Sequence, residues 1–391
     1  METILKPREE RLQMVKNRRT MRIAVPKENF DEETRMPLTP QGVEVLVAQG
    51  HEVLIETKAG QEAKFSDSQY VEAGARIVKS HSAAFAADLV IKMSLPTEDE
   101  LQFLKDGTSL MCFATQHKRS KDLYNALSAK KCNIIALDFL TDGGVEPIIT
   151  RCIGEIDGML AVTTAAHLLE NTDGGKGVII GGVTAVPPTE IIILGTNMAA
   201  LRAARTAIAL GASVKIFGNQ HADLQQISPQ LPNQVFTSVL HLQALTKAMT
   251  SADVVIGNQI APGTHSYVVS ADIVKMMKKR AVIVDLNCNY GGRFETSHPT
   301  TIKQPTFEYG SVIHHCLNNI SVLAPHTATI VVSDIITPII TNIINQGSLS
   351  YAIRDDRNIA NGIVMLNGIT TNNYVAGIFD ADYYDINLLI Y

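Results

Sequence analysis

The feature that most constrains this chain of 391 residues is the stretch IIILGTNMAALRAARTAIALGASVKIFGN, at residues 191–219. It reads as a short apolar strand, a tight turn, an alanine-rich helix and a second strand. A helix between two such strands returns the chain so that the second strand lies parallel to the first. The stretch therefore predicts an α/β fold with a parallel sheet.

The turn in this stretch carries a changed form of the pattern G-x-G-x-x-G/A of dinucleotide-binding units. In that pattern the first glycine allows the turn, the second admits the pyrophosphate, and the third packs helix against strand. The corresponding residues are Gly195, Asn197 and Ala200, and the second strand ends at Gly218, where an acidic residue would hold a ribose of NAD. We expect these four residues to line an NAD site in which binding is weakened or lost.

The composition is that of an ordinary globular protein. Hydrophobic residues make up 46%, charged residues 19%, and the formal net charge is -5, which makes nucleic acid an unsuitable partner. The five cysteines show no C-x-x-C spacing, which predicts free thiols in a reducing compartment. The basic segment 6–19 lacks the apolar core of a signal peptide, and no long apolar run predicts a membrane span. We expect a cytoplasmic protein without membrane contact.

Two series of short apolar runs alternate with helical segments. RIAVPK, HEVLIET, ADLVIKMS, SLMCFAT and CNIIALD form the first, and VKIF, DVVIG and AVIVDLN continue the second. This rhythm is typical of doubly wound parallel sheets covered on both faces. Apolar helices at residues 153–169 and 333–344 would join two domains. We expect a substrate domain from residues 1–150 plus 325–391 and an NAD-type domain from residues 151–324.

Several long segments carry a family resemblance. MRIAVPKENFDEETRMPLTP, GGKGVIIGGVTAVPPTE and VIVDLNCNYGGRFETSHPTT resemble alanine dehydrogenases and the related soluble domain of nicotinamide nucleotide transhydrogenases, from residue 21 to the C-terminus. The segment GGRFETSHPTT favours the alanine dehydrogenase branch. The resemblance implies two Rossmann-like domains with a cleft between them, a small amino-acid or 2-oxo-acid substrate, and a homo-oligomer, either hexamer or dimer.

The resemblance also assigns roles to residues. Arg35 in TRMPLTP and Lys92 in DLVIKMS match the positions that bind the substrate carboxylate, and a planar guanidinium suits that role. The catalytic histidine of the family aligns with Gln116 or, after a one-residue gap, with His117. The catalytic Asp of the family is replaced by Asn289, and an amide exchanges no proton near neutral pH.

Other polar residues are expected to have structural roles rather than catalytic or metal-binding ones. His314, His315 and Cys316 are adjacent, but no complementary cluster follows them, so we expect packing and no metal site. Asp285, four residues before Asn289, is interpreted as a structural carboxylate.

Three functions remain open from the sequence. The first is an NAD-linked alanine dehydrogenase, in which Arg35 and Lys92 hold the carboxylate and Asn289 with His117 or Gln116 orients the reacting group. The second is a non-catalytic or regulatory paralogue, which better explains the changes at Asn197, Gly218 and Asn289. The third is a transhydrogenase-like nucleotide-binding protein.

Overall fold

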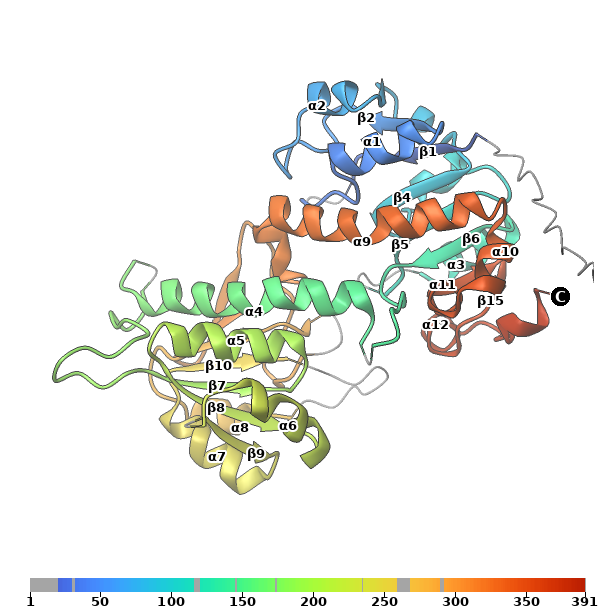
Figure 1. Cartoon of the computed structure of the whole chain (residues 1–391). Coiled ribbons are helices and arrows are strands. Elements are labelled where there is room, and N and C mark those ends of the chain that lie inside the picture. Colours follow the sequence, from blue (N-terminus) through green and yellow to red (C-terminus); the bar gives the residue numbers. More distant parts are fainter. Residues whose placement is uncertain are drawn as a thin grey trace, which may run out of the picture.

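The computed structural model describes residues 20–29, 32–115, 120–144, 146–172, 174–233, 235–258, 268–288 and 292–390. Within these residues the strands form one eight-stranded and one seven-stranded sheet. Helices pack against both sheets (Figure 1). The predicted α/β class with two mainly parallel sheets is confirmed.

The first sheet has the order β15-β14-β6-β5-β4-β1-β2-β3. Its strands are β1 (Arg22–Val25), β2 (Glu52–Glu56), β3 (Arg76–Val78), β4 (Leu89–Ser94), β5 (Ser109–Phe113), β6 (Asn133–Ala136), β14 (Ile363–Leu366) and β15 (Ile369–Thr370). Strands β1 to β6 pair in parallel, whereas β14 runs antiparallel to β6 and to β15. The C-terminal part of the chain thus completes the N-terminal sheet, although the exact division at residues 150 and 324 stays a prediction.

The second sheet has the order β12-β13-β11-β10-β7-β8-β9. Its strands are β7 (Glu190–Leu194), β8 (Ser213–Gly218), β9 (Phe236–Val239), β10 (Val254–Gly257), β11 (Val282–Asp285), β12 (Thr306–Tyr309) and β13 (Val312–His315). Only β12 runs antiparallel among these described strands. Residues 191–219 supply most of β7, all of β8 and the helix α5 (Met198–Ala209) between them.

Most other helices connect successive strands. They are α1 (Pro40–Ala48), α2 (Asp67–Glu72), α3 (Lys121–Ala129), α6 (His221–Ile227), α7 (Leu242–Ser251), α8 (Ala271–Lys275), α10 (Leu349–Asp355), α11 (Arg357–Gly362) and α12 (Asn373–Phe379). Short 3-10 helices are η1 (Ser82–Phe85), η2 (Asp99–Phe103), η3 (Ser228–Gln230), η5 (Ile320–Leu323) and η6 (Ile386–Leu388). Their apolar faces cover both sides of each sheet, as continuous apolar strands require.

Two long helices, α4 (Ile148–Leu169) and α9 (Pro325–Asn345), lie side by side where the two sheets meet (Figure 1). Both are apolar enough by length and composition to cross a membrane, but about half of each is buried inside the protein. Core helices of soluble proteins have the same character. Helix α4 packs most extensively on α5, α9 and η5, so its side chains reach both halves of the molecule.

Small residues set the distance between α4 and α5. A Cβ on Gly158 would collide with the backbone of Ala199, and one on Gly154 would lie 3.3 Å from the Ala199 nitrogen. Glycine is needed here because the two backbones approach closely. The neighbouring residue Asp157 is therefore held firmly relative to the start of α5.

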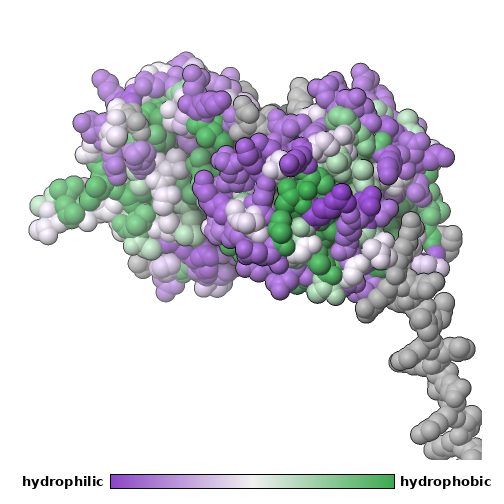
Figure 2. Space-filling view, turned by 90° about the horizontal axis from the view of Figure 1, so that it is seen from above, coloured by the Kyte–Doolittle hydropathy of each residue, from purple (hydrophilic) through white to green (hydrophobic). Residues whose placement is uncertain are grey.

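A projecting apolar arm extends from the second half of the molecule, at the left of Figure 2. It comprises residues 177–188, in which an isolated bridge pairs Val183 with Val186. Val178, Ile179, Val183 and Val186 are all exposed. An exposed apolar surface of this kind indicates a contact with another molecule.

Candidate functional site

Arg35 lies after β1, and its side chain is fully buried. Its Nε and Nη2 donate to the two carboxylate oxygens of Glu33 at 2.8 and 2.6 Å, and its Nη1 donates to Ser321 Oγ of η5 at 3.2 Å. Burial alone would lower the pKa of Arg35, but the nearby carboxylates outweigh it and raise the pKa. The guanidinium is thus a fixed, permanently charged group at the junction of the two sheets.

Asp157 of α4 is a second carboxylate beside Arg35. Its Oδ1 atom is buried and has no hydrogen-bond partner. Burial raises the pKa of Asp157 to about 6, against the opposing effects of Arg35 and of hydrogen bonds from the hydroxyl and backbone N–H of Ser321. The Ser321 side chain therefore contacts both the cation and this carboxyl.

Lys92 lies in β4 and is also buried. Its Nζ lies 3.0 Å from Glu100 Oε1 and 3.2 Å from Glu28 Oε2. Burial would lower the pKa of Lys92, but the two carboxylates raise it overall. Glu28 is in turn held by Met93 N and Ser94 Oγ at 2.6 and 3.0 Å, so the cation occupies one defined position.

His81 extends this network toward solvent. Its Nε2 contacts Glu100 Oε1 at 2.9 Å and its Nδ1 contacts Glu56 Oε2 at 2.7 Å. Although burial would raise the pKa of Glu100, its contacts with Lys92, with the Thr97 backbone and with His81 lower that pKa. Lys92 therefore faces an ionised carboxylate.

The predicted catalytic residue His117 and its alternative Gln116 lie outside the described residues. The described chain leading to them is firmly held, because Asp138 accepts hydrogen bonds from the backbone nitrogens of Ala114 and Thr115 at 3.0 and 2.9 Å. Burial nevertheless raises the pKa of Asp138. The assignment of His117 stays a prediction.

Asn289, the other predicted catalytic residue, also lies outside the described residues. Asp285, at the end of β11, accepts hydrogen bonds from Arg293 N and Ser297 Oγ at 2.7 Å each and from Asn287 N at 3.0 Å. Burial raises the pKa of Asp285. These bonds hold the described residues on both sides of positions 289–291, which is a structural role.

The turn of the nucleotide-type unit retains its backbone form. Gly195 has φ of 136°, a conformation that glycine adopts readily. Asn197 is the N-cap of α5: its Oδ1 accepts from Ala200 N at 3.1 Å and from the side chain of Asn258. The Asn197 side chain therefore serves the helix and its neighbour, and Ala200 is buried in the helix interface.

Gly218 is enclosed rather than open. A Cβ at this position would lie 2.7 Å from Thr196 Cγ2 and 3.0 Å from the side chain of Leu224. An acidic side chain at position 218 would require both neighbours to move. Packing, in addition to ligand chemistry, thus favours glycine at the end of β8.

Glu146 occupies the start of α5. Its carboxyl accepts a hydrogen bond from the backbone N–H of Met198, the first residue of that helix, which lowers its pKa. Partial burial has the larger effect and raises the pKa of Glu146 overall. Helix N-termini bind anions because their N–H groups are free and the helix dipole is positive there. The carboxyl stands in for an anionic ligand, so these residues fit the phosphates of a dinucleotide, which would compete with Glu146.

His314 and His315 of β13 are buried, and burial lowers the pKa of each to about 4. His314 Nε2 lies 2.8 Å from Thr296 Oγ1, in keeping with a packing role. Among the described residues, no three His, Cys, Asp or Glu side chains gather as a metal site would need. The absence of a metal therefore stays a prediction.

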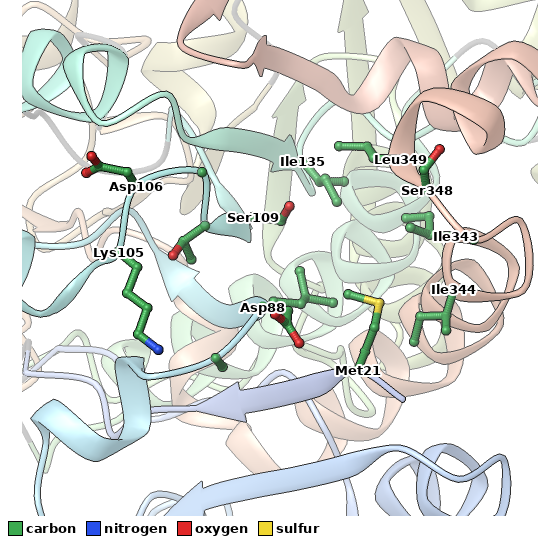
Figure 3. A pocket seen from close by; sticks show the side chains of 15 residues that line it. Met21, Asp88, Lys105, Asp106, Ser109, Ile135, Ile343, Ile344, Ser348 and Leu349 are labelled. Atoms are coloured by element: carbon green, nitrogen blue, oxygen red, sulfur yellow. The ribbon is translucent and has the colours of Figure 1, made fainter. Parts of the chain in front are cut away.

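A pocket of about 370 Å³ lies elsewhere in the first sheet (Figure 3). Met21, Asp88, Lys105 and Ser109 are among the residues that line it. Ser109 begins β5, so the pocket lies at the amino ends of the strands. Ligands of open α/β sheets bind beyond the carboxyl ends, so this pocket is separate from the candidate site.

The fold and these contacts define a two-sheet α/β protein with buried cations beside the first sheet and a dinucleotide-type strand–helix–strand unit in the second. Residues 24–146 match the family described as alanine dehydrogenase/PNT, N-terminal domain, and residues 161–373 match its C-terminal domain. The chain belongs to the alanine dehydrogenase/PNT family. The sequence resemblance is thereby confirmed.

Individual relatives agree with this placement. An alanine dehydrogenase of Staphylococcus epidermidis is 34% identical over 94% of this chain and 99% of the relative. One of Bacillus subtilis is 33% identical over 91% of this chain and 94% of the relative. A solved L-alanine dehydrogenase structure superimposes with a TM-score of 0.86 at 32% identity, covering 92% of this chain and 99% of that one. A transhydrogenase from Sinorhizobium meliloti, at 19% identity and a TM-score of 0.75 over 90% and 99%, shares the fold.

Sequence reasoning missed the carboxylates of this site. Glu33 was visible two residues before Arg35, but Asp157 lies more than a hundred residues from Arg35 and Ser321, and Glu146 and Met198 lie in separate segments of the chain. The two acidic residues of the otherwise mostly small and apolar segment 153–169, Glu155 and Asp157, were the available signal for Asp157. No sequence pattern indicated that Glu146 would reach Met198.

Proposed function

We propose that this chain is an NAD-linked oxidoreductase that interconverts L-alanine with pyruvate and ammonia. The observation that carries the proposal is the pair of buried cations, Arg35 and Lys92, at the carboxyl-end side of the first sheet. Buried cations held by carboxylates form a preorganised site for the carboxylate of a small acid. NAD, when bound, would accept the hydride from the substrate α carbon.

The geometry supports distinct tasks for the two cations. Arg35 is planar and directed by Glu33 and Ser321, so it would orient the substrate carboxylate. Lys92 is a compact charge fixed between Glu28 and Glu100, so it would offset the charge of the same substrate. His117 and Asn289 are proposed to lie near the reacting group, as the family resemblance implies.

Nucleotide binding in this chain is proposed to be weaker than the fold alone would allow. Glu146 already accepts the N–H of Met198, and a carboxylate beside a pyrophosphate repels it. Gly218 has no side chain to accept a hydrogen bond from a ribose hydroxyl, and a Cβ there would collide with Thr196. The loss of such a charged hydrogen bond is worth about 1.5 to 3 kcal/mol.

We also propose an oligomeric state, a cellular compartment and a division into domains for this chain. The apolar arm at residues 177–188 supports a homo-oligomer, because Val178, Ile179, Val183 and Val186 would be covered in one. The five cysteines are free thiols, which supports a reducing cytoplasm. The proposed domains are residues 1–150 plus 325–391 for substrate and 151–324 for NAD.

The test begins with calorimetric titration of the full chain with NAD and NADH. Nucleotide binding is expected in the micromolar to millimolar range, and no heat at millimolar nucleotide would overturn the proposal. An assay of NADH formation with L-alanine, and of its consumption with pyruvate and ammonia, then measures turnover.

Glu146 at the start of α5 gives the non-catalytic alternative a specific basis, because it competes with the nucleotide phosphates. Nucleotide binding without turnover would favour that alternative. Recovery of turnover in Asn289→Asp would then identify the missing carboxylate as the cause. Turnover in the unaltered chain would exclude the alternative.

A further inference from the structure

The proposed reaction needs a group that accepts a proton from the substrate amine. The sequence supplies Asn289 where the family has a carboxylate, and the family histidine aligns with Gln116 or His117. A well-placed proton acceptor contributes roughly 100- to 10,000-fold to such a reaction. A carboxyl close to the substrate cations would meet this need.

Asp157 is placed for that role by Arg35, by Ser321 and by the packing of its own helix. Helix α4 carries it to Arg35 and Ser321, and the Ser321 hydroxyl touches both of them. Its Oδ1 is buried without a partner, while the residue as a whole is partly exposed. The close packing of Gly158 on Ala199 fixes the carboxyl relative to the start of α5. An amino acid whose carboxylate binds Arg35 would thus bring its ammonium group close to this carboxyl.

The charges around Asp157 favour an ammonium group over a second anion. Glu33 neutralises Arg35 through two contacts, and Asp157 adds a further carboxylate. The elements packed against α4 also carry Arg202 and Arg205 of α5, Asp285 of β11, and His326 and Asp334 of α9. Arg202 pairs with Glu155, Arg205 with Gln230 and His326 with Ala63 O. Arg35 is the charged group that acts on Asp157.

We propose that Asp157 accepts the proton of the substrate α-ammonium group, a role that rests on the proposed function. The N–H bond of the ammonium breaks, and its proton forms an O–H bond with the carboxylate of Asp157. The amine lone pair then forms the C=N bond as the α hydrogen leaves as a hydride to NAD. The substrate loses two electrons, which NAD would take up when bound, and Asp157, a partly exposed residue, releases its proton to solvent.

The pH dependence of this group follows from its surroundings. The pKa of about 6 places Asp157 largely in the charged, proton-accepting form above neutral pH. Ser321 lowers that pKa through its hydroxyl. Removing the hydroxyl should therefore move the acid limb of alanine oxidation to higher pH.

The experiment measures kcat and kcat/KM for alanine oxidation from pH 5 to pH 10 in the wild type, Asp157→Asn, Asp157→Glu and Ser321→Ala. Asp157→Asn should lower kcat by about 100- to 10,000-fold and remove the acid limb, while Asp157→Glu recovers part of the rate. Ser321→Ala should keep the limb and shift it upward. NAD binding, measured by calorimetry, should change less than twofold in each variant.

The control is Glu155→Gln on the same helix, whose carboxyl pairs with Arg202; it should behave as the wild type. An active wild type with an Asp157→Asn variant that keeps its rate and acid limb overturns the role of Asp157 alone. Loss of the limb in His117→Gln instead would assign the proton to His117 and overturn the proposal in the same way. A wild type that binds NAD but never turns over alanine overturns both this role and the proposed function.

Discussion

The region around Arg35 and Lys92 and the start of α5 differ in the groups that they offer to a ligand. In the first region, buried side-chain charges hold one another, so each cation has at least one carboxylate partner. In the second, backbone N–H groups and a tight turn supply the binding groups. Side-chain charge networks resist change, because losing one member leaves another buried and unpaired. A backbone site keeps its fold while the side chains around it change, as at Asn197 and Gly218.

The largest effect is expected from Lys92→Met, which tests whether the buried charge network resists change. The substitution keeps the side-chain length but leaves Glu28 and Glu100 buried without their cation. The free energy of unfolding should fall by about 3 to 5 kcal/mol, measured by urea denaturation followed by circular dichroism at pH 8. The matched control is Lys121→Met, whose pair with Asp380 is exposed, so the free energy of unfolding should change little in this variant. An equal loss of unfolding free energy in both variants would show that the buried charge network around Lys92 stabilises the fold no more than an exposed ion pair.

Asp157→Asn should stabilise the protein at pH 8. The pKa of Asp157 is raised from 3.8 to about 6 in the folded protein, so the folded state disfavours the charged carboxylate. The cost is absent below about pH 4, grows as the pH rises to 6, and then stays constant at about 2 to 3 kcal/mol. Asparagine removes that cost.

Thermal unfolding of the wild type and Asp157→Asn at pH 4, 6 and 8 measures this difference. The gain in unfolding temperature should be largest at pH 8 and vanish toward pH 4. A loss of stability at pH 8 would show that the charged form of Asp157 is favoured in the fold. Asp157 would then stabilise the fold in its charged form, as the carboxylates around Lys92 do.

The fold was largely predictable from the sequence, because strand and helix periodicity are local properties. Residues 191–219 form β7, α5 and β8 as expected, and the apolar strands indicated sheets covered on both faces. The cations Arg35 and Lys92 were also identified, through their family motifs. The carboxylates Asp157 and Glu146 were not, because their contacts depend on how α4 packs between the two sheets. Gly218 was interpreted as a lost ligand, whereas its contacts with Thr196 and Leu224 depend on tertiary structure.

Glu146→Gln tests the second half of the comparison, at the start of α5. Glutamine keeps an acceptor for Met198 N–H but removes the negative charge that would repel a pyrophosphate. NAD affinity at pH 8 should rise about tenfold, which corresponds to about 1.4 kcal/mol, in calorimetric titration. The gain should shrink as the pH falls, because the raised pKa of Glu146 makes the wild-type carboxyl neutral sooner. An NAD affinity that is unchanged by Glu146→Gln at pH 8 and at lower pH would exclude Glu146 as a competitor of the nucleotide. Glu155→Gln serves as the control.

The smallest effect is expected at Asn197, which distinguishes a helix cap from a nucleotide contact. Because Asn197 Oδ1 caps α5 through Ala200 N, Asn197→Ala should lower the free energy of unfolding by about 1 kcal/mol, and Asn197→Gly by a few tenths. Thermal unfolding measures both. Since the side chain is turned to the helix and to Asn258, NAD affinity should stay within about threefold, roughly 0.7 kcal/mol, in each variant. A tenfold gain in NAD affinity in Asn197→Gly alone would instead show that the Asn197 side chain keeps the pyrophosphate away. The backbone site at the start of α5 would then depend on the side chains around it.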